Sequence, residues 1–236
     1  MKEKEFVTAI VLAAGRGTRM GTKIQKQYLD LCGKPVLYYS LHAFQESPLI
    51  DEILLVTGEQ EIEYCRKEIV EKFDFQKVKK IVAGGAERFL SVYNGLKACT
   101  CDFVYIHDGA RPFVDEPMLE RVYAAVCKYE ACLVGMPVKD TIKIADTAGF
   151  IKETPKRSLV WQIQTPQCFV TAEIREAYQK MMEAGDDSVT DDGMVMETYG
   201  IRGVRMIKGS YENMKITTPE DMLLGEAILK GRSTER

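Results

Sequence analysis

The residues best suited to chemistry follow the first apolar segment of the chain, residues 7–14. The next stretch reads GRGTRMG, from Gly15 to Gly21, and Lys26 comes shortly after it. Glycines after a strand let backbone N–H groups approach an anion closely, and phosphate is the usual anion at such turns. Arg19 and Lys26 add two cations, which suit a triphosphate whose negative charge rises at the α-phosphorus during attack. The stretch predicts a triphosphate site, against the plainer alternative of a tight turn with solvated charges.

Two familiar glycine motifs do not fit this stretch. The Walker A pattern is absent, because no Gly-Lys-Ser/Thr follows the glycines. The dinucleotide fingerprint begins as Gly15-x-Gly17, but Met20 stands where its third glycine would be. A nicotinamide-dependent dehydrogenase is therefore a poor interpretation.

A second group of polar residues ends the fourth apolar segment. In open parallel sheets, ligands lie beyond the carboxyl ends of the strands, so Asp108 is placed to hold a hard cation such as Mg²⁺. Glu212, later in the chain, could reach the same metal, and Lys215 could reach a phosphate. His107 is more often a hydrogen-bonded structural residue than a ligand at such a position. Arg111 suits a phosphate and a neighbouring carboxylate equally well.

Two further polar segments precede expected helices. Gly84 and Gly85, with Arg88 and Ser91 beyond them, form a turn into a helix N-terminus that suits contacts with a base or a ribose. The acidic run TDD, residues 190–192, is most simply a helix cap followed by first-turn acids.

The elements that must position these residues alternate over the first half of the chain. Short apolar runs predict strands over 7–14, 53–57, 80–83 and 103–107. Segments with helical period predict helices over 35–45, 60–72, 88–97 and 117–128. This alternation predicts a doubly wound α/β fold, a Rossmann-like, mostly parallel sheet with helices on both faces.

The pattern changes after Gly135. Strand-like pieces at 141–145, 150–152 and 160–163, with a turn at 147–149, predict an antiparallel β-arm over about 139–164. An exposed strand edge must be covered, and a second subunit is the usual solution. Helical signals return at 171–184, closed by Gly185, and again from Pro219 to a stop at Gly231. Without repeats, low-complexity stretches or linkers, the chain reads as one domain, 1–236, plus the arm.

Composition limits the class of protein. The 236 residues carry 32 Lys and Arg against 35 Asp and Glu, a net charge of −3, which argues against a broad nucleic-acid-binding face. Two histidines exclude a His-rich metal centre, and seven cysteines without a C-x-x-C pair make a poor disulfide framework or zinc site. No apolar stretch reaches the ~18 residues that span a bilayer. We expect a globular cytoplasmic protein without a membrane partner.

In family order, the chain contains LAAGRGTRMG, KQYLDLCGKPVL, GGAERFLSVYNGL, HDGARPF, PVKDTIK, QTPQCF, TDD and ENMKITTPED. With these motifs, over residues 7–222, it resembles the bacterial 2-C-methyl-D-erythritol 4-phosphate cytidylyltransferases. The resemblance implies a Mg²⁺-dependent homodimer of nucleotidyltransferase fold, acting in the non-mevalonate isoprenoid pathway. Such an enzyme transfers a cytidylyl group from CTP to a small polyol phosphate, 2-C-methyl-D-erythritol 4-phosphate, and releases pyrophosphate.

The resemblance also implies a role for each matching position. Six positions would line the nucleotide site: Ala13, Ala14, Gly15, Gly85, Ser91 and Gly109. Three cations would act in catalysis: Arg19, Lys26 and Lys215. Five positions would contact the sugar phosphate, two of them from the other subunit's arm: Asp108, Arg111, Thr141, Arg157 and Thr165. The metal would lie beside Asp108 and Glu212.

Three positions depart from the family pattern. Ala86 replaces an acidic residue, Gly109 stands where alanine can occur, and Glu212 stands where aspartate is common. Two alternatives remain open at this point: a ribitol 5-phosphate cytidylyltransferase of the same group, and a non-catalytic nucleotide-binding protein of the same fold.

Overall fold

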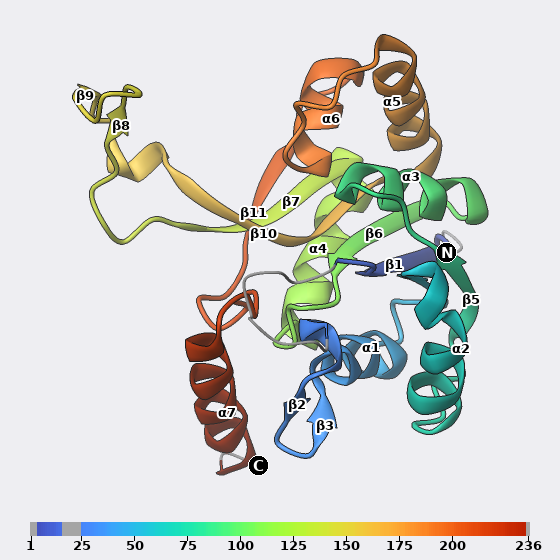
Figure 1. Cartoon of the computed structure of the whole chain (residues 1–236). Helices are drawn as coiled ribbons and strands as arrows, with labels where there is room; N and C mark the ends of the chain where they lie inside the picture. Colours follow the sequence, from blue (N-terminus) through green and yellow to red (C-terminus); the bar gives the residue numbers. More distant parts are fainter. Residues whose placement is uncertain (1–3, 16–24, 235–236) are drawn as a thin grey trace.

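The computed structural model describes residues 4–15 and 25–234, and its centre is a seven-stranded sheet (Figure 1). The strand order is β11-β7-β10-β6-β1-β4-β5. The bounds of these strands are β1 Val7–Ala13, β4 Glu52–Thr57, β5 Val78–Ala83, β6 Phe103–Asp108, β7 Ala131–Pro137, β10 Trp161–Val170 and β11 Arg205–Lys208. All neighbouring pairs are parallel except those of β10, which runs antiparallel to both β6 and β7. The mostly parallel sheet predicted from the sequence is confirmed.

Helices cover both faces of this sheet. Its main helices are α1 Val36–Glu46, α3 Arg88–Ala98, α4 Glu116–Tyr129, α5 Thr171–Ala184, α6 Asp192–Tyr199 and α7 Pro219–Thr234. Alternate side chains of β1 enter two different cores: Ala9 and Val11 pack with α1 and α4, whereas Ile10 packs with α3 and α5. A strand that is buried on both faces reads as a continuous apolar run, which explains the sequence pattern.

Two predicted helices differ from the structure in their winding or their end. The segment predicted over 60–72 comprises a 3₁₀ turn (Glu59–Glu61), the short α2 (Ile62–Tyr64) and a π-helical stretch (Cys65–Glu71). The stop predicted at Gly231 is wrong, because α7 continues to Thr234. A single glycine costs only about 1 kcal/mol in a helix, so it need not end one.

The segment after β7 contains the largest correction. The strand predicted over 160–163 as part of the arm is, from Trp161 onward, the start of β10, a ten-residue strand of the central sheet. The register of β10 against β7 shifts between Ile163 and Gln167, and this irregularity hides the strand's period. The arm itself carries β8 (Ile144–Ala145) paired antiparallel with β9 (Ile151–Glu153). Residues 141–143, predicted as strand, lie outside both strands.

The arm begins where the central strands β1 and β6 end, and it extends away from the sheet (Figure 1). Since β7 is parallel to β1 while β10 is reversed, the end of β7 and the start of β10 lie on the side of the sheet where β1 and β6 end.

Among the described residues, no helix combines the length and the apolar character needed to cross a membrane. The small ribbon of β2 (Asp30–Leu31) and β3 (Lys34–Pro35) precedes α1.

Candidate active site

The predicted site residues gather where the central strands end. Asp108 is the last residue of β6, Ala13 the last of β1, and the Gly84–Gly85 turn follows β5 directly. Ligands of open α/β sheets bind beyond these carboxyl ends. Arg19 lies outside the described residues, and its predicted role is untested.

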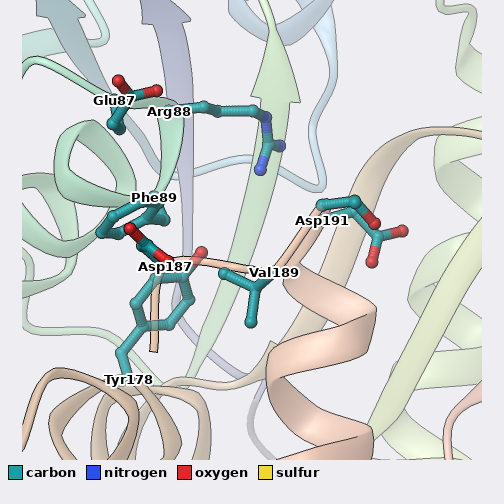
Figure 2. Close-up of a pocket in the computed structure, with 8 residues that line it drawn as sticks. Glu87, Arg88, Phe89, Tyr178, Asp187, Val189 and Asp191 are labelled. Atoms are coloured by element: carbon teal, nitrogen blue, oxygen red, sulfur yellow. The ribbon is translucent and has the colours of Figure 1, made fainter. Parts of the chain in front are cut away.

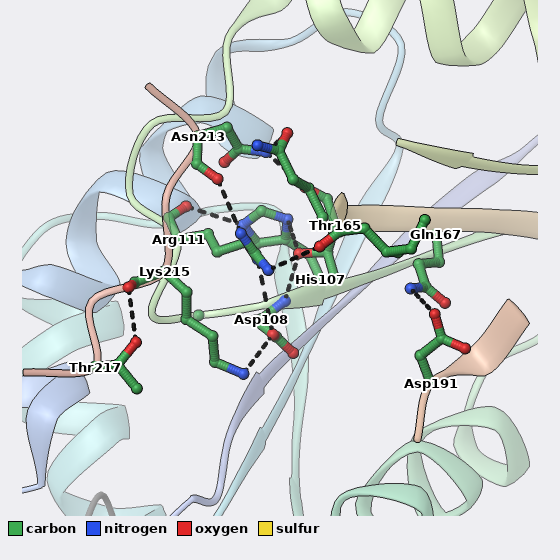
Figure 3. Close-up of polar contacts among 12 residues, drawn as sticks. His107, Asp108, Arg111, Thr165, Gln167, Asp191, Asn213, Lys215 and Thr217 are labelled. Atoms are coloured by element: carbon green, nitrogen blue, oxygen red, sulfur yellow. Dashed lines mark hydrogen bonds and ion pairs between the residues drawn. The ribbon is translucent and has the colours of Figure 1, made fainter. Parts of the chain in front are cut away.

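Asp108 is the electrostatic centre of the site (Figure 3). Its Oδ2 accepts a hydrogen bond from Lys215 Nζ at 2.7 Å, and its Oδ1 accepts one from Arg88 Nε at 3.2 Å. Arg111 Nε lies 3.9 Å from Oδ2. Burial alone would raise the pKa of Asp108, but the charges of Arg88, Lys215 and Arg111 hold this pKa far below its usual range. Asp108 is therefore a fixed anion among three cations.

A chain of hydrogen bonds fixes the backbone of Asp108. The Asp108 N–H donates to Thr165 Oγ1 at 3.1 Å, and this hydroxyl lies 3.0 Å from His107 Nδ1. His107 Nε2 lies 3.1 Å from the Arg111 carbonyl, which can only accept, so Nε2 carries the proton and Nδ1 accepts from Thr165. Burial lowers the pKa of His107 to about 4, so the ring is neutral. His107 is the structural residue that its position predicted.

Two residues predicted to bind substrate are used within the protein. Thr165 is 3% exposed, and its hydroxyl both accepts from Asp108 and donates to His107. Arg111 donates to the carbonyls of Asn213 at 2.9 Å and Ile163 at 3.4 Å. Of the two partners that the sequence left open for Arg111, the structure shows the carboxylate. Both side chains hold β6, β10 and the 209–217 loop together.

Residues predicted to bind the nucleotide form a closely packed glycine turn. The Gly84 N–H donates to the Thr57 carbonyl at the end of β4, and the Gly85 N–H donates to Ser91 Oγ. A Cβ added to Gly84 would lie 2.5 Å from the Ala14 Cβ, so only glycine allows this approach. Ser91 is 4% exposed and holds the turn. The turn and the end of β1 are in direct contact, as a shared nucleotide site requires.

Other predicted residues of the nucleotide and phosphate site lie at or near the end of β1. Gly109 is buried against β1, where an added Cβ would lie 3.0 Å from the Leu12 carbonyl oxygen. Gly15 is exposed, and Lys26 is nearly buried in a 3₁₀ turn over Lys26–Tyr28. The sequence did not single out Gln27, whose Nε2 donates to the carbonyls of Ala13 and Gly15. Its place next to Lys26, a predicted catalytic residue, was the only signal in the sequence that could have revealed it.

Three predicted residues lie apart from this centre within one chain. Thr141 and Arg157 belong to the arm and are exposed; Arg157 donates to the Lys139 carbonyl at its base. Glu212 accepts from Arg232 of α7 at 2.9 and 3.0 Å, whereas Asp108 is held by other cations. The two carboxylates predicted as a metal pair are thus engaged separately. Ala86, one of the departures, is exposed beside the glycine turn.

The carboxylates of the site do not form a ready metal centre. Over residues 4–15 and 25–234, no three His, Cys, Asp or Glu side chains come close enough to hold a metal ion. Both oxygens of Asp108 already accept from cations. The described part of the site is instead suited to a polyanion, because Arg88, Arg111 and Lys215 surround one carboxylate.

A cavity of about 180 Å³ lies beside this cationic centre, between the N-terminus of α3 and the segment before α6 (Figure 2). Arg88 and Tyr178 line it together with the acidic residues Glu87, Asp187 and Asp191. The Arg88 guanidinium donates to both oxygens of Asp192, at 2.9 and 2.8 Å. The sequence placed Asp192 in the first turn of a helix, which is confirmed, but did not reveal this contact.

Comparison with known proteins gives one consistent result. Residues 7–231 match the family model of 2-C-methyl-D-erythritol 4-phosphate cytidylyltransferase. The protein of that name from Lachnospira eligens is 50% identical over 95% of this chain and 99% of its own length. The protein of the same name from Caldanaerobacter subterraneus is 47% identical over 95% of this chain and 99% of its own length.

Solved structures agree with the sequence comparisons. The 4-diphosphocytidyl-2C-methyl-D-erythritol synthase of Anaerococcus prevotii superposes with a TM-score of 0.84 at 35% identity, covering 97% of this chain and all of that one. The Thermus thermophilus 2-C-methyl-D-erythritol 4-phosphate cytidylyltransferase superposes with a TM-score of 0.76 at 28% identity, covering 94% and 98%. With its Gly84–Gly85 turn and its cation-ringed aspartate both at the carboxyl ends of the strands, the chain belongs to the 2-C-methyl-D-erythritol 4-phosphate cytidylyltransferase family.

Proposed function

We propose that this protein transfers the cytidylyl group of CTP to 2-C-methyl-D-erythritol 4-phosphate, as the names of its relatives state for them. The observation that carries the proposal is the buried Asp108 carboxylate with Arg88, Arg111 and Lys215 around it. This centre lies at the carboxyl ends of the strands, as does the Gly84–Gly85 turn, in a chain of this family.

The chemistry requires little proton transfer. A phosphate oxygen of the polyol phosphate attacks the α-phosphorus of CTP, the bond from that phosphorus to the β-phosphate oxygen breaks, and pyrophosphate leaves. A phosphate monoester is largely dianionic near neutral pH, since its second pKa is about 6. A strong general base is not needed, and neutral, buried His107 is consistent with that.

The main barrier is repulsion between two polyanions, so positioning and electrostatic stabilisation would supply most of the catalysis. Lys215, oriented by Asp108, and Lys26, next to Gln27 at the end of β1, would offset the charge that develops on the α-phosphate. Arg19 would join them. The turns at Ala13–Gly15 and Gly85, with Ser91 and Gly109, would hold the nucleotide.

We propose that Mg²⁺ enters as the MgCTP complex, held mainly by the triphosphate. Direct binding to Asp108 or Glu212 would compete with the cations that both oxygens of Asp108 and Oε2 of Glu212 already contact. A chelator should then abolish pyrophosphate release but leave the melting temperature of the nucleotide-free protein unchanged. A lower melting temperature after chelation would instead indicate a resident metal.

The arm supports a homodimer. Its side chains Ile144, Phe150, Ile151 and Leu159 are 47%, 74%, 62% and 75% exposed, which is costly for an isolated chain. We propose that this apolar surface packs against a second copy and brings Thr141 and Arg157 to the partner's site.

We propose a cytoplasmic location, because the seven cysteines are free and thiols stay reduced in that compartment.

The first experiment measures pyrophosphate release from CTP and Mg²⁺ with 2-C-methyl-D-erythritol 4-phosphate or ribitol 5-phosphate. We expect release with the first acceptor alone. Release only with ribitol 5-phosphate would keep the fold and the nucleotide site but replace the acceptor. A folded protein that binds CTP but is inactive with both would be a non-catalytic member of the fold.

A further inference from the structure

One arginine of the site is shared between two carboxylates. Arg88 Nε donates to Asp108, while its other two nitrogens donate to both oxygens of Asp192. Asp192 is 0% exposed, and its Oδ1 also accepts from the Tyr178 hydroxyl at 2.6 Å. A bidentate pair of this kind fixes the plane and the direction of a guanidinium, and not only its charge.

Asp192 is itself held rigidly. The neighbouring Asp191 caps α6 and accepts from Gln167 Nε2 at 3.0 Å, and Gln167 Oε1 accepts from the Gly193 N–H at 2.9 Å. Gly193 packs so closely on Leu133 of β7 that an added Cβ would lie 2.5 Å from its Cδ1. The start of α6 is thus anchored to β10 and β7, and Asp192 has little freedom to move.

A chain of side-chain contacts links Asp192 to Lys215. Asp192 orients Arg88, Arg88 holds Oδ1 of Asp108, and the other oxygen of Asp108 holds the Lys215 ammonium at 2.7 Å. Lys215 has a flexible four-carbon side chain, so its position depends on its partner. A charge that must meet a developing phosphate charge works best when its position is fixed before the reaction.

We propose that Asp192, which would not touch either substrate, is a positioning residue that fixes Lys215 through Arg88 and Asp108. The inference rests on the proposed cytidylyltransferase function. It assigns the buried end of α6 to the catalytic geometry, where the sequence indicated only a helix cap.

The test compares Asp192→Asn with Asp191→Asn. Both changes remove one negative charge from adjacent positions at the start of α6, but only Asp192 contacts Arg88. We expect Asp192→Asn to lower kcat on the order of tenfold to 100-fold, with much smaller changes in either KM, because a misplaced charge acts mainly in the transition state. Asp191→Asn keeps a side-chain oxygen that can accept from the Met194 N–H and cap α6, so the start of the helix stays in place; we expect Tm to change little and kcat to stay unchanged.

A double-mutant cycle separates positioning from simple stability. If Asp192 acts through Arg88, adding Asp192→Asn to Arg88→Gln should lower kcat little further. Losses that multiply, or an Asp192→Asn enzyme as active as Asp191→Asn, would overturn the proposal. If Asp192→Asn fails to fold, Tyr178→Phe removes a single hydrogen bond to Asp192 and should lower kcat less, in the same direction.

A crystal structure of Asp192→Asn, or of Tyr178→Phe if needed, gives a readout independent of activity. We expect the contact between Arg88 Nε and Asp108, 3.2 Å in the native chain, to be lost or lengthened. An unchanged contact would contradict the positioning role. A wild-type protein inactive with CTP and both acceptors would contradict the proposed function instead, so the two failures are distinguishable.

Discussion

At the scale of single residues, the site is built around the carboxylate of Asp108 and the cations that contact it. Asp108 stays ionised because three cations outweigh its burial, and its own charge then fixes Lys215. The sequence predicted that Asp108 and Lys215 belong to one site, and the structure brings them to 2.7 Å. Asp192 could not be found that way, because its local pattern is that of a helix start and nothing in it indicates a contact with Arg88.

Lys215→Ala tests the electrostatic part of the mechanism. We expect kcat to fall on the order of 10²–10³-fold, because a fixed cation at the developing charge is lost. Tm should change little, since Asp108 retains Arg88 and Arg111. Lys208→Ala, an exposed lysine at the end of β11, is the control and should keep full activity. Near-normal turnover of Lys215→Ala would contradict the mechanism.

The lowered pKa of His107 predicts how stability depends on pH. Between about pH 6.5 and 4, the unfolded chain binds a proton at His107 that the folded chain does not. The free energy of unfolding should therefore fall as the pH drops through this window, by up to about 3 kcal/mol from this residue. Above pH 6.5 both states are neutral there, and the contribution is constant.

Urea unfolding at several pH values between 4 and 7 measures this slope, with His107→Gln as the comparison. The variant should be less stable at pH 7, because it disturbs the Thr165 and Arg111 contacts, but its stability should fall less steeply toward pH 4. Carboxylates that titrate in the same window are common to both proteins, so the difference isolates His107. Equal slopes would show that His107 does not titrate this way.

At the scale of elements, strands buried on both faces were the most predictable, since a continuous apolar run needs no partner to be recognised. β1 and β6 are such strands. Of β10, the sequence predicted only the first residues, within a strand over 160–163, and the remainder was missed because the register against β7 shifts after Ile163. Whether this segment joins the central sheet depends on its pairing with β7, and strand pairing leaves no local signal in the sequence.

Gly84→Ala tests whether the close contact between two elements makes the nucleotide site. The new methyl group would lie 2.5 Å from Ala14 and 2.8 Å from Ser91 Oγ, so the turn must move away from the end of β1. We expect the Kd for CTP, measured by calorimetry, to rise at least about tenfold, a cost of about 1.4 kcal/mol. Gly231→Ala is the matched change in α7, where nothing lies within 4 Å, and should leave CTP affinity unaltered. Unchanged CTP binding by Gly84→Ala would remove this turn from the site.

At the scale of the whole molecule, the position of the arm connects assembly with catalysis. The arm leaves the sheet at the carboxyl ends of the strands, where Asp108 and the Gly84–Gly85 turn lie, yet it extends away from its own site (Figure 1). Its exposed side chains include both apolar residues and the predicted substrate contact Arg157. The sequence predicted an arm that needs a partner, and a symmetric dimer would satisfy both features by exchanging arms.

Mixing two inactive chains tests that exchange. Lys26→Ala and Arg157→Ala should each abolish most activity, because each removes one cation from every site. In a mixed dimer with exchanged arms, one of the two sites receives native Lys26 from its own chain and native Arg157 from the partner. Random mixing makes half of the dimers mixed, so activity should return to about one quarter of the native value. If each chain used its own arm, every site would still lack one cation. Purified mixed dimers without activity, or a chain that sediments as a monomer, would therefore show that the sites are not shared.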